Sequence, residues 1–88
     1  MARILVIDDD YQVREMLRDT LEIAGYEVEV ASDGREGLKL YHNRPTDMII
    51  TDIIMPNMDG LETITELQRN FPDTKIIAFS GGGFTLPD

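Results

Sequence analysis

The chain has 88 residues, enough for one small domain with a single hydrophobic core and too few for a second. Eight basic against seventeen acidic residues give a net charge of −9, which disfavours electrostatic binding to nucleic acid or to anionic lipid. Cysteine is absent, and no apolar run is long enough to span a membrane, so we expect a cytoplasmic protein without disulfides or a thiolate metal site.

The first apolar run predicts a buried strand that leads into a helix. Residues 4–7 read Ile-Leu-Val-Ile, a pattern typical of a strand that is buried on both faces of a parallel sheet. The helix is expected to begin after Asp10, whose side chain can accept hydrogen bonds from the first turn. Its apolar residues recur at helical spacing until Gly25, which is a natural stop.

An edge strand and a second helix follow. Residues 27–31 alternate polar and apolar side chains, which predicts a strand at the edge of the sheet with one face in water. Asp33 and Glu36 form a capping-box pattern that predicts the start of a helix. Pro45 ends this helix before the next strand begins.

The second half of the sequence predicts one more unit of strand, helix and strand. Residues 48–51 form the third strand, and residues 53–60 contain a proline and an Asp-Gly pair that indicate a loop. A third helix carries apolar side chains at helical spacing from Leu61 to Phe71. Residues 75–79 are mostly apolar without alternation and predict a fourth strand with a neighbour on each side.

These units predict an α/β fold with a doubly wound parallel sheet in the flavodoxin-like order 2-1-3-4. Residues 1–80 would form this domain, which is incomplete because it lacks a fifth strand and the last helices. Residues 81–88 are expected to form a glycine-rich loop and the start of a missing helix, since Thr85 and Pro87 suit a first turn.

Three aspartates come directly after buried strands: Asp8 and Asp9 follow the first, and Asp52 follows the third. Ligands of open α/β sheets bind at the carboxyl ends of the strands, so we expect these side chains to converge. Two carboxylates about 4 Å apart repel by roughly 4 kcal/mol at an effective dielectric constant near 20. The cluster therefore needs raised pKa values or a cation, and oxygen ligands suit Mg²⁺. A carboxylate can also accept a phosphoryl group, and Ser80 can offer a hydroxyl to it.

The order of these residues resembles that of a known family. Asp8-Asp9, the stretch from Asp52 to Gly60, and Ser80 are similar to the motifs of the receiver domain of two-component response regulators. The resemblance covers most of the chain, and the stretch after Asp52 is its most specific part.

The resemblance implies a role for each residue of the site. Asp52 would be the phosphoacceptor, and Asp9 and Asp52 would ligate Mg²⁺ through their side chains. Asp8 would act through a metal-bound water, and Ile54 would contribute its backbone carbonyl. Ser80 would be the switch hydroxyl that turns towards the phosphoryl group. The resemblance also implies a signalling domain rather than an enzyme, with at most self-phosphorylation and self-dephosphorylation chemistry.

The sequence departs from the family pattern. Receivers of this kind carry a fifth strand ending in a lysine that pairs with a phosphoryl oxygen, together with a switch aromatic and a fifth helix, and no residues here correspond to these features. Lys39 lies on a predicted helix, and Lys75 opens a strand far from its carboxyl end. We therefore expect metal binding together with less efficient phosphorylation.

Two other interpretations stay open. One is a Mg²⁺-dependent phosphohydrolase resembling the haloacid dehalogenase group, with Asp8 as the nucleophile and Asp10 as the acid/base. The other is a truncated, non-catalytic receiver that self-associates, because residues 76–79 would form an unpaired apolar edge and sheet surface beside the first helix would be uncovered.

The partners follow from the resemblance and the charge. A histidine kinase or a phosphotransfer protein would donate the phosphoryl group. We expect no nucleic-acid or membrane partner, and a homo-oligomer through the edge of the fourth strand.

Overall fold

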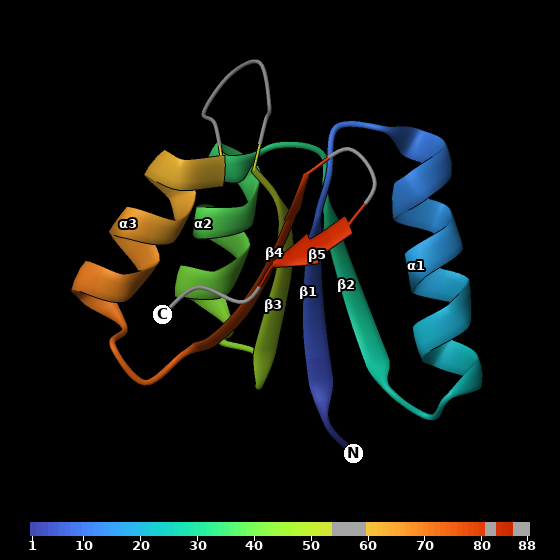
Figure 1. The fold of residues 1–88 in the computed structure, drawn as a ribbon. Coiled ribbons are helices and arrows are strands. Elements are labelled where there is room, and N and C mark those ends of the chain that lie inside the picture. The colour runs from blue at the N-terminus through green and yellow to red at the C-terminus, as the bar shows by residue number, and fades with distance from the viewer. Residues whose placement is uncertain (54–59, 81–82, 86–88) are drawn as a thin grey trace.

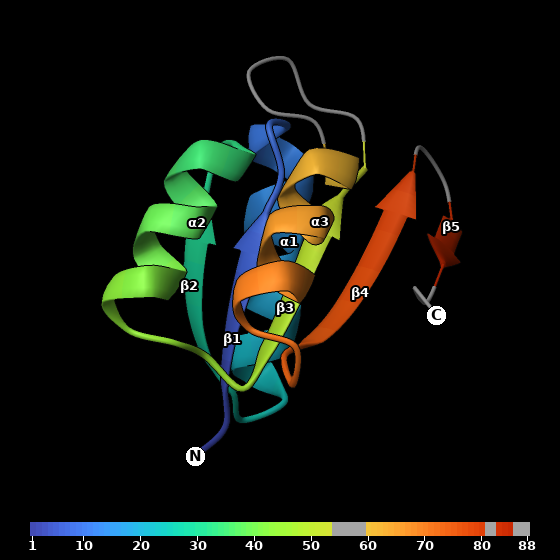
Figure 2. The ribbon, with the colours of Figure 1, turned by 90° about the vertical axis from the view of Figure 1, so that its left-hand side faces the viewer.

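A computed structural model of the chain describes residues 1–53, 60–80 and 83–85. One sheet with the strand order β2-β1-β3-β4-β5 forms its centre, with α1 on one face and α2 and α3 on the other (Figures 1 and 2). The elements are β1 (Arg3–Ile7), α1 (Tyr11–Ile23), β2 (Glu27–Ala31), α2 (Gly34–Asn43), β3 (Met48–Asp52), α3 (Gly60–Asn70), β4 (Lys75–Ser80) and β5 (Gly83–Thr85). The first four strands are parallel, so the predicted doubly wound sheet and its order 2-1-3-4 are confirmed.

The core has two layers because successive residues of a strand face opposite sides of the sheet. The cluster under α2 and α3 contains Leu5, Ile7, Ala31, Tyr41, Ile49 and Leu67. The cluster on the α1 face contains Ile4, Val6 and Ile50, with Leu17 and Leu21 of α1 against it. The central strands are therefore buried on both faces, which explains their unbroken apolar runs.

The predicted helix starts are confirmed by their hydrogen bonds. The Asp10 Oδ1 atom accepts from the backbone N–H of Gln12 at 2.9 Å and so caps α1. Gly25, just beyond the end of this helix, has a φ of 101°, which glycine adopts without strain. At α2, Asp33 Oδ1 accepts from the N–H of Glu36 at 2.8 Å.

The capping box of α2 differs in one detail from the usual pattern. Glu36 Oε1 accepts from the backbone N–H of Ser32 at 2.7 Å, one residue before the cap residue Asp33. The reciprocal bond thus ties the helix to the end of β2, which helps to fix where the second strand stops.

The end of the chain corrects the sequence prediction. Residues 81–88 are expected to be a loop and a helix start, but Gly83–Thr85 form β5, which pairs antiparallel with β4. This strand is a short return of the chain and not a parallel strand of another β-α-β unit. It forms because β4 would otherwise present unpaired backbone groups, and a hairpin satisfies them locally.

The predicted unpaired edge is accordingly wrong in its carboxyl half. Ala78, Phe79 and Ser80 pair with β5, so residues 75–77 are the part of β4 without a second strand neighbour among the described residues. Beside them, an apolar cavity of about 500 Å³ opens between α1 and the sheet. Its wall includes Leu21 and Ile77, in agreement with the expected uncovered surface beside the first helix.

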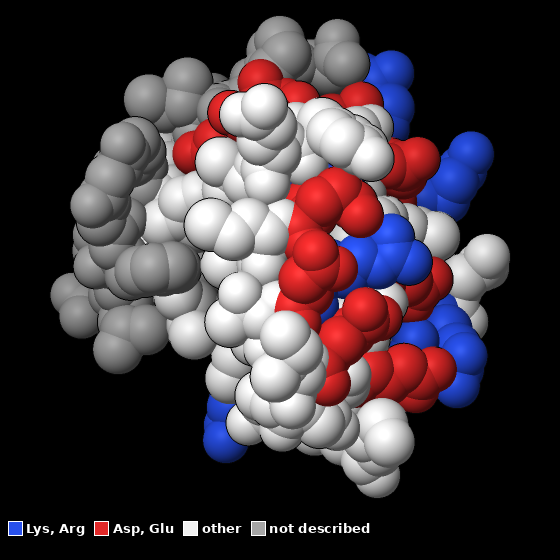
Figure 3. Space-filling model, turned by 90° about the vertical axis from the view of Figure 1, so that its right-hand side faces the viewer, with Lys and Arg blue, Asp and Glu red and all other residues white. Residues whose placement is uncertain are grey.

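Charged side chains gather on the α1 face of the molecule, where acidic and basic groups are interleaved (Figure 3). Arg18 on α1 lies 3.5 Å from Glu15 and 3.9 Å from Glu22. Arginines thus stand among the acids instead of forming a basic patch on this face. In the part of the chain that the structure describes, no helix has the length and apolar character needed to cross a membrane.

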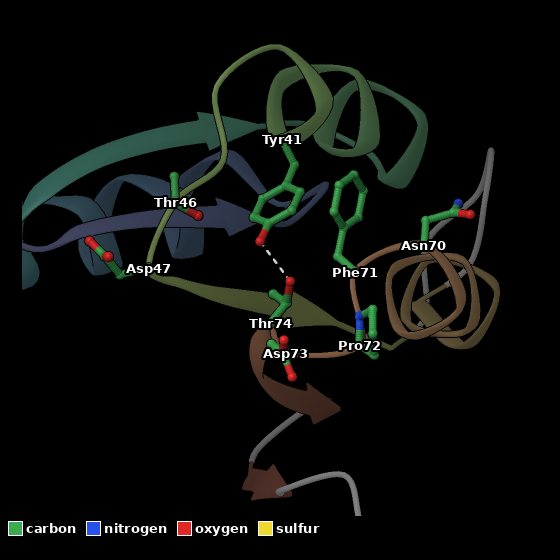
Figure 4. Close-up of a pocket in the computed structure, with 8 residues that line it drawn as sticks. All are labelled: Tyr41, Thr46, Asp47, Asn70, Phe71, Pro72, Asp73 and Thr74. Carbon is green, nitrogen blue, oxygen red and sulfur yellow. Dashed lines mark hydrogen bonds between the residues drawn. The ribbon is translucent and has the colours of Figure 1, made fainter.

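The amino ends of β3 and β4 border a second pocket of about 380 Å³ (Figure 4). There Tyr41 of α2 forms a hydrogen bond of 2.6 Å between its hydroxyl and the hydroxyl of Thr74. Its ring meets Phe71 edge-on with a centroid distance of 4.9 Å. These contacts join α2 to the segment between α3 and β4, at the edge of the sheet opposite to the aspartates.

Replacing Tyr41 by phenylalanine removes this hydrogen bond and keeps the ring. We expect Tyr41→Phe to lower the free energy of unfolding by about 1 kcal/mol, measured by urea denaturation. Mg²⁺ affinity is expected to stay unchanged, since the pocket lies at the opposite edge. A variant as stable as the wild type would show that the bond contributes nothing.

Candidate metal centre

The parallel pairing of β1 with β3 brings the aspartates together. Ile7 lies opposite Thr51 in the register of the two strands, so Asp8 and Asp52 leave the sheet at the same level. One carboxylate oxygen from each of Asp8, Asp9 and Asp52 lies within 4.8 Å of the others. The predicted convergence of these three side chains at the carboxyl edge is therefore present in the structure.

The three consecutive aspartates after β1 differ in burial and in hydrogen bonding. Asp8 is 1% exposed, its N–H donates to the carbonyl of Ala31, and its Oδ1 atom accepts from the N–H of Asp10 at 2.8 Å. Asp9 is exposed, and the side chain of Asp10 caps α1. Asp52 is half-buried at the end of β3.

Burial raises the pKa of the Asp8 carboxyl from its ordinary value of 3.8 to about 6. The hydrogen bond from the Asp10 backbone opposes the rise, whereas the negative charges of Asp52 and Asp9 add to it. The carboxylate form of Asp8 thus lacks a sufficient counter-charge in the protein itself. A cation in the cluster would supply that charge and favour the ionised form.

The donor set fits Mg²⁺. Magnesium prefers carboxylate oxygens, usually takes only one or two of them, and retains several water molecules. Here one buried, one half-buried and one exposed carboxylate converge, so an ion can bind and keep waters on the solvent side. The residues that would hold it are Asp8, Asp9 and Asp52.

The structure describes the other predicted site residues to different extents. Ile54, expected to offer its carbonyl, lies outside the described residues. Ser80 ends β4 next to β3, one residue beyond the Asp52–Phe79 pair, so its backbone is at the same edge of the sheet. Its role as switch hydroxyl stays a prediction. Lys39 is on α2 and Lys75 begins β4, and both are exposed, so neither lysine starts from the carboxyl edge.

Sequence reasoning missed Arg14. Its Nη1 atom donates to the backbone carbonyl oxygen of Asp8 at 3.0 Å, and its guanidinium lies 5.4 Å from the ring centroid of Tyr11. Arg14 thereby holds the first turn of α1 against the turn that carries Asp8. The available signal was its place four residues after the helix cap Asp10, but the contact depends on how the chain turns between strand and helix.

Comparisons with known proteins agree on one family. The family model described as response regulator receiver domain matches residues 4–84. The curated protein response regulator MprA of Mycolicibacterium vanbaalenii is 45% identical over 79 residues, which are 90% of this chain and 34% of that protein. The chain thus spans about a third of the length of the curated relatives that it matches.

Solved structures give the same result. The response regulator protein TrrA from Thermotoga maritima, in complex with Mg(2+)-BeF, is 41% identical with a TM-score of 0.88, covering 91% of this chain and 70% of that one. A response regulator receiver domain protein from Clostridium thermocellum is 35% identical with a TM-score of 0.87, covering 94% of this chain and 68% of that one.

The raised pKa of Asp8 makes the stability of the metal-free protein pH-dependent. Because the folded state holds this proton more tightly than the unfolded state, the resulting stability is full below about pH 4 and is lost as pH rises through about 6. The loss amounts to about 3 kcal/mol. We expect Asp8→Asn, which keeps the acceptor for Asp10, to be more stable than wild type at pH 7.5 and to lose this advantage at pH 4.5.

Urea denaturation of both proteins without divalent ions at the two pH values measures this difference. Asp19→Asn, on the exposed side of α1, controls for the loss of one negative charge. Addition of Mg²⁺ at pH 7.5 should stabilise the wild type more than Asp8→Asn. Equal stability of wild type and Asp8→Asn at pH 7.5 would contradict the assignment.

Proposed function

This chain belongs to the response regulator receiver domain family of two-component signalling, and we propose that it accepts a phosphoryl group on Asp52. The observation that carries the proposal is the convergence of Asp8, Asp9 and Asp52 within 4.8 Å at the carboxyl edge of the sheet. Asp8 and Asp9 follow β1 and Asp52 ends β3, so the paired aspartates and the proposed phosphoacceptor come from neighbouring parallel strands. Asp52 stands apart from the paired aspartates and is half-buried, which suits a group that is modified.

The transfer involves one bond made and one broken. A carboxylate oxygen of Asp52 attacks the phosphorus atom of the donor, and the bond from phosphorus to the donor breaks. The electron pair of that bond leaves with the donor group, an imidazole of a histidine kinase or phosphotransfer protein. Asp9 and Asp52, with the carbonyl of Ile54, would hold Mg²⁺ and Asp8 would act through a metal-bound water; when bound, the ion neutralises phosphoryl oxygens.

Ser80 is proposed as the group that senses the product. Its backbone lies beside the end of β3, and the proposed role of its hydroxyl is to donate to an oxygen of a phosphoryl group on Asp52. Because Ser80 is also the last residue of β4 and pairs with Gly83 of β5, a change at this position would reach the hairpin. This connection supports a conformational switch in which β4 and β5 respond to phosphorylation.

The phosphohydrolase interpretation is disfavoured by the site. It needs Asp10 as an acid/base, but Asp10 Oδ1 accepts hydrogen bonds from Gln12 and Val13 at the start of α1. It would also require membership of a different family, whereas the receiver domain model matches residues 4–84. The chain is accordingly a signalling domain, and we propose self-phosphorylation and self-dephosphorylation as its own chemistry. A cytoplasmic location stays a prediction from the sequence.

Incubation with acetyl phosphate and Mg²⁺, followed by intact-mass measurement, tests the proposal. We expect the wild type to gain the mass of one phosphoryl group and Asp52→Asn to gain none, because the amide is not a nucleophile. Neither Lys39 nor Lys75 starts from the site, so we expect the transfer to be slow while Mg²⁺ binding is retained.

Asp19→Asn is the matched control, because Asp19 is an exposed aspartate of α1 outside the carboxylate cluster. It should be phosphorylated like the wild type. An adduct that persists in Asp52→Asn would place the modification on another residue. A wild type that binds Mg²⁺ but never gains the adduct would show that the domain binds metal without accepting a phosphoryl group.

We also propose that two copies associate through residues 75–77 of β4 and the adjoining apolar cavity. Lys75 and Asp47 both border this cavity and carry opposite charges. Lys75 forms no ion pair with another described residue. In a two-fold dimer the same patch faces itself, so each Lys75 can meet Asp47 of the second copy.

Light scattering over a range of concentrations tests this association. We expect the mass to rise towards that of a dimer. Lys75→Glu should suppress the rise, because each introduced glutamate side chain would then face the like-charged Asp47 of the second copy. A constant monomer mass for the wild type at the highest concentration would rule the dimer out.

A further inference from the structure

The start of α3 is in direct backbone contact with the end of β3. The N–H of Gly60 donates to the carbonyl oxygen of Ile53 at 2.5 Å, and Gly60 is buried. A Cβ atom at Gly60 would overlap the carbonyl oxygen of Asp52 and the Cα atom of Ile53. The helix can therefore begin here only because this residue has no side chain.

Two other glycines provide a contrast. A Cβ at Gly37 would meet atoms of the Ile7 side chain, and its three nearest atoms all belong to that side chain rather than to backbone. A Cβ at Gly25 would have no atom within 4 Å, and its only demand is the φ of 101°. At Gly60 the obstructing atoms are backbone, which cannot move without displacing the residue that carries the site carboxylate.

We propose that Gly60 is a positioning residue for Asp52, an inference that rests on the proposed function of that aspartate. The close contact seats α3 against the backbone of residues 52–53 and sets the position of the Asp52 carboxylate relative to Asp8 and Asp9. Mg²⁺ tolerates little error in this position, because it requires nearly ideal octahedral geometry with bonds of about 2.0–2.1 Å. A displacement of the Asp52 backbone by a few tenths of an ångström is therefore felt at the metal and at the attacking oxygen.

Gly60→Ala and Gly25→Ala test the proposal as a matched pair. Both introduce one methyl group, but only the first faces the backbone of the site. Mg²⁺ affinity is measured by calorimetry and the initial rate of phosphorylation by intact mass, at a temperature where circular dichroism shows each variant folded. We expect Gly60→Ala to bind Mg²⁺ about tenfold more weakly or worse, with a slower transfer.

Gly25→Ala is expected to lower the melting temperature and to leave Mg²⁺ affinity and the phosphorylation rate unchanged. A purely structural role of Gly60 would give the same pattern as Gly25, with wild-type affinity in the folded variant, and would overturn the proposal. If the wild type binds Mg²⁺ but is not phosphorylated, the proposed function fails while the change in affinity still decides the role of Gly60. A wild type that binds no Mg²⁺ overturns both.

A wild-type measurement decides the matter if Gly60→Ala does not fold. Hydrogen exchange of the Gly60 amide reports on its bond to Ile53, and that of Gly25 reports on a site-independent turn. We expect Mg²⁺ to slow exchange at Gly60 and not at Gly25. Equal exchange at Gly60 with and without bound Mg²⁺ would overturn the proposal.

Discussion

The parallel register between β1 and β3 is the constraint on which the site depends. Leu5 pairs with Ile49 and Ile7 with Thr51, and the side chains of Leu5 and Ile7 are fully buried. A slip by one residue would move Leu5 and Ile7 to the opposite face of the sheet, so the core resists it. This burial keeps Asp8 and Asp52 at one level despite their repulsion. Hydrophobic packing thus holds mutually repelling carboxylates together, and a bound cation would offset their repulsion.

The two edges of the sheet have opposite character as a result. At the amino edge, Arg3 donates to Glu29 and to the carbonyl of Pro45, both at 2.9 Å, and Tyr41 bonds to Thr74. These contacts join neighbouring segments, although the buried Nε atom of Arg3 has no hydrogen-bond partner among the described residues. At the carboxyl edge, buried Asp8 has a raised pKa, and its turn is held by backbone hydrogen bonds. The amino edge thus holds polar contacts between segments, whereas the carboxyl edge holds the carboxylates on which the proposed chemistry depends.

Much of the fold could be predicted from local signals. The cap at Asp10, the capping box at Asp33 and the stop at Gly25 are each decided by a few neighbouring residues, and each is present in the structure. The hairpin return of β5 could not be predicted in this way. Its strand is only three residues long, and it forms because the edge of β4 would otherwise present unpaired backbone N–H and C=O groups. Such pairing is a property of the folded sheet and leaves no periodic pattern in the sequence.

For the site, the sequence by itself determined which residues are acidic and that they follow buried strands, and this sufficed to predict the cluster of Asp8, Asp9 and Asp52. Only the tertiary structure decided that Asp8 is buried, that Arg14 holds its turn, and that Gly60 touches the backbone of the phosphoacceptor proposed here. The physical reason is the separation along the sequence of the residues that interact. Strand ends and caps arise from interactions within a few residues, whereas desolvation and backbone contacts depend on which segments the core brings together.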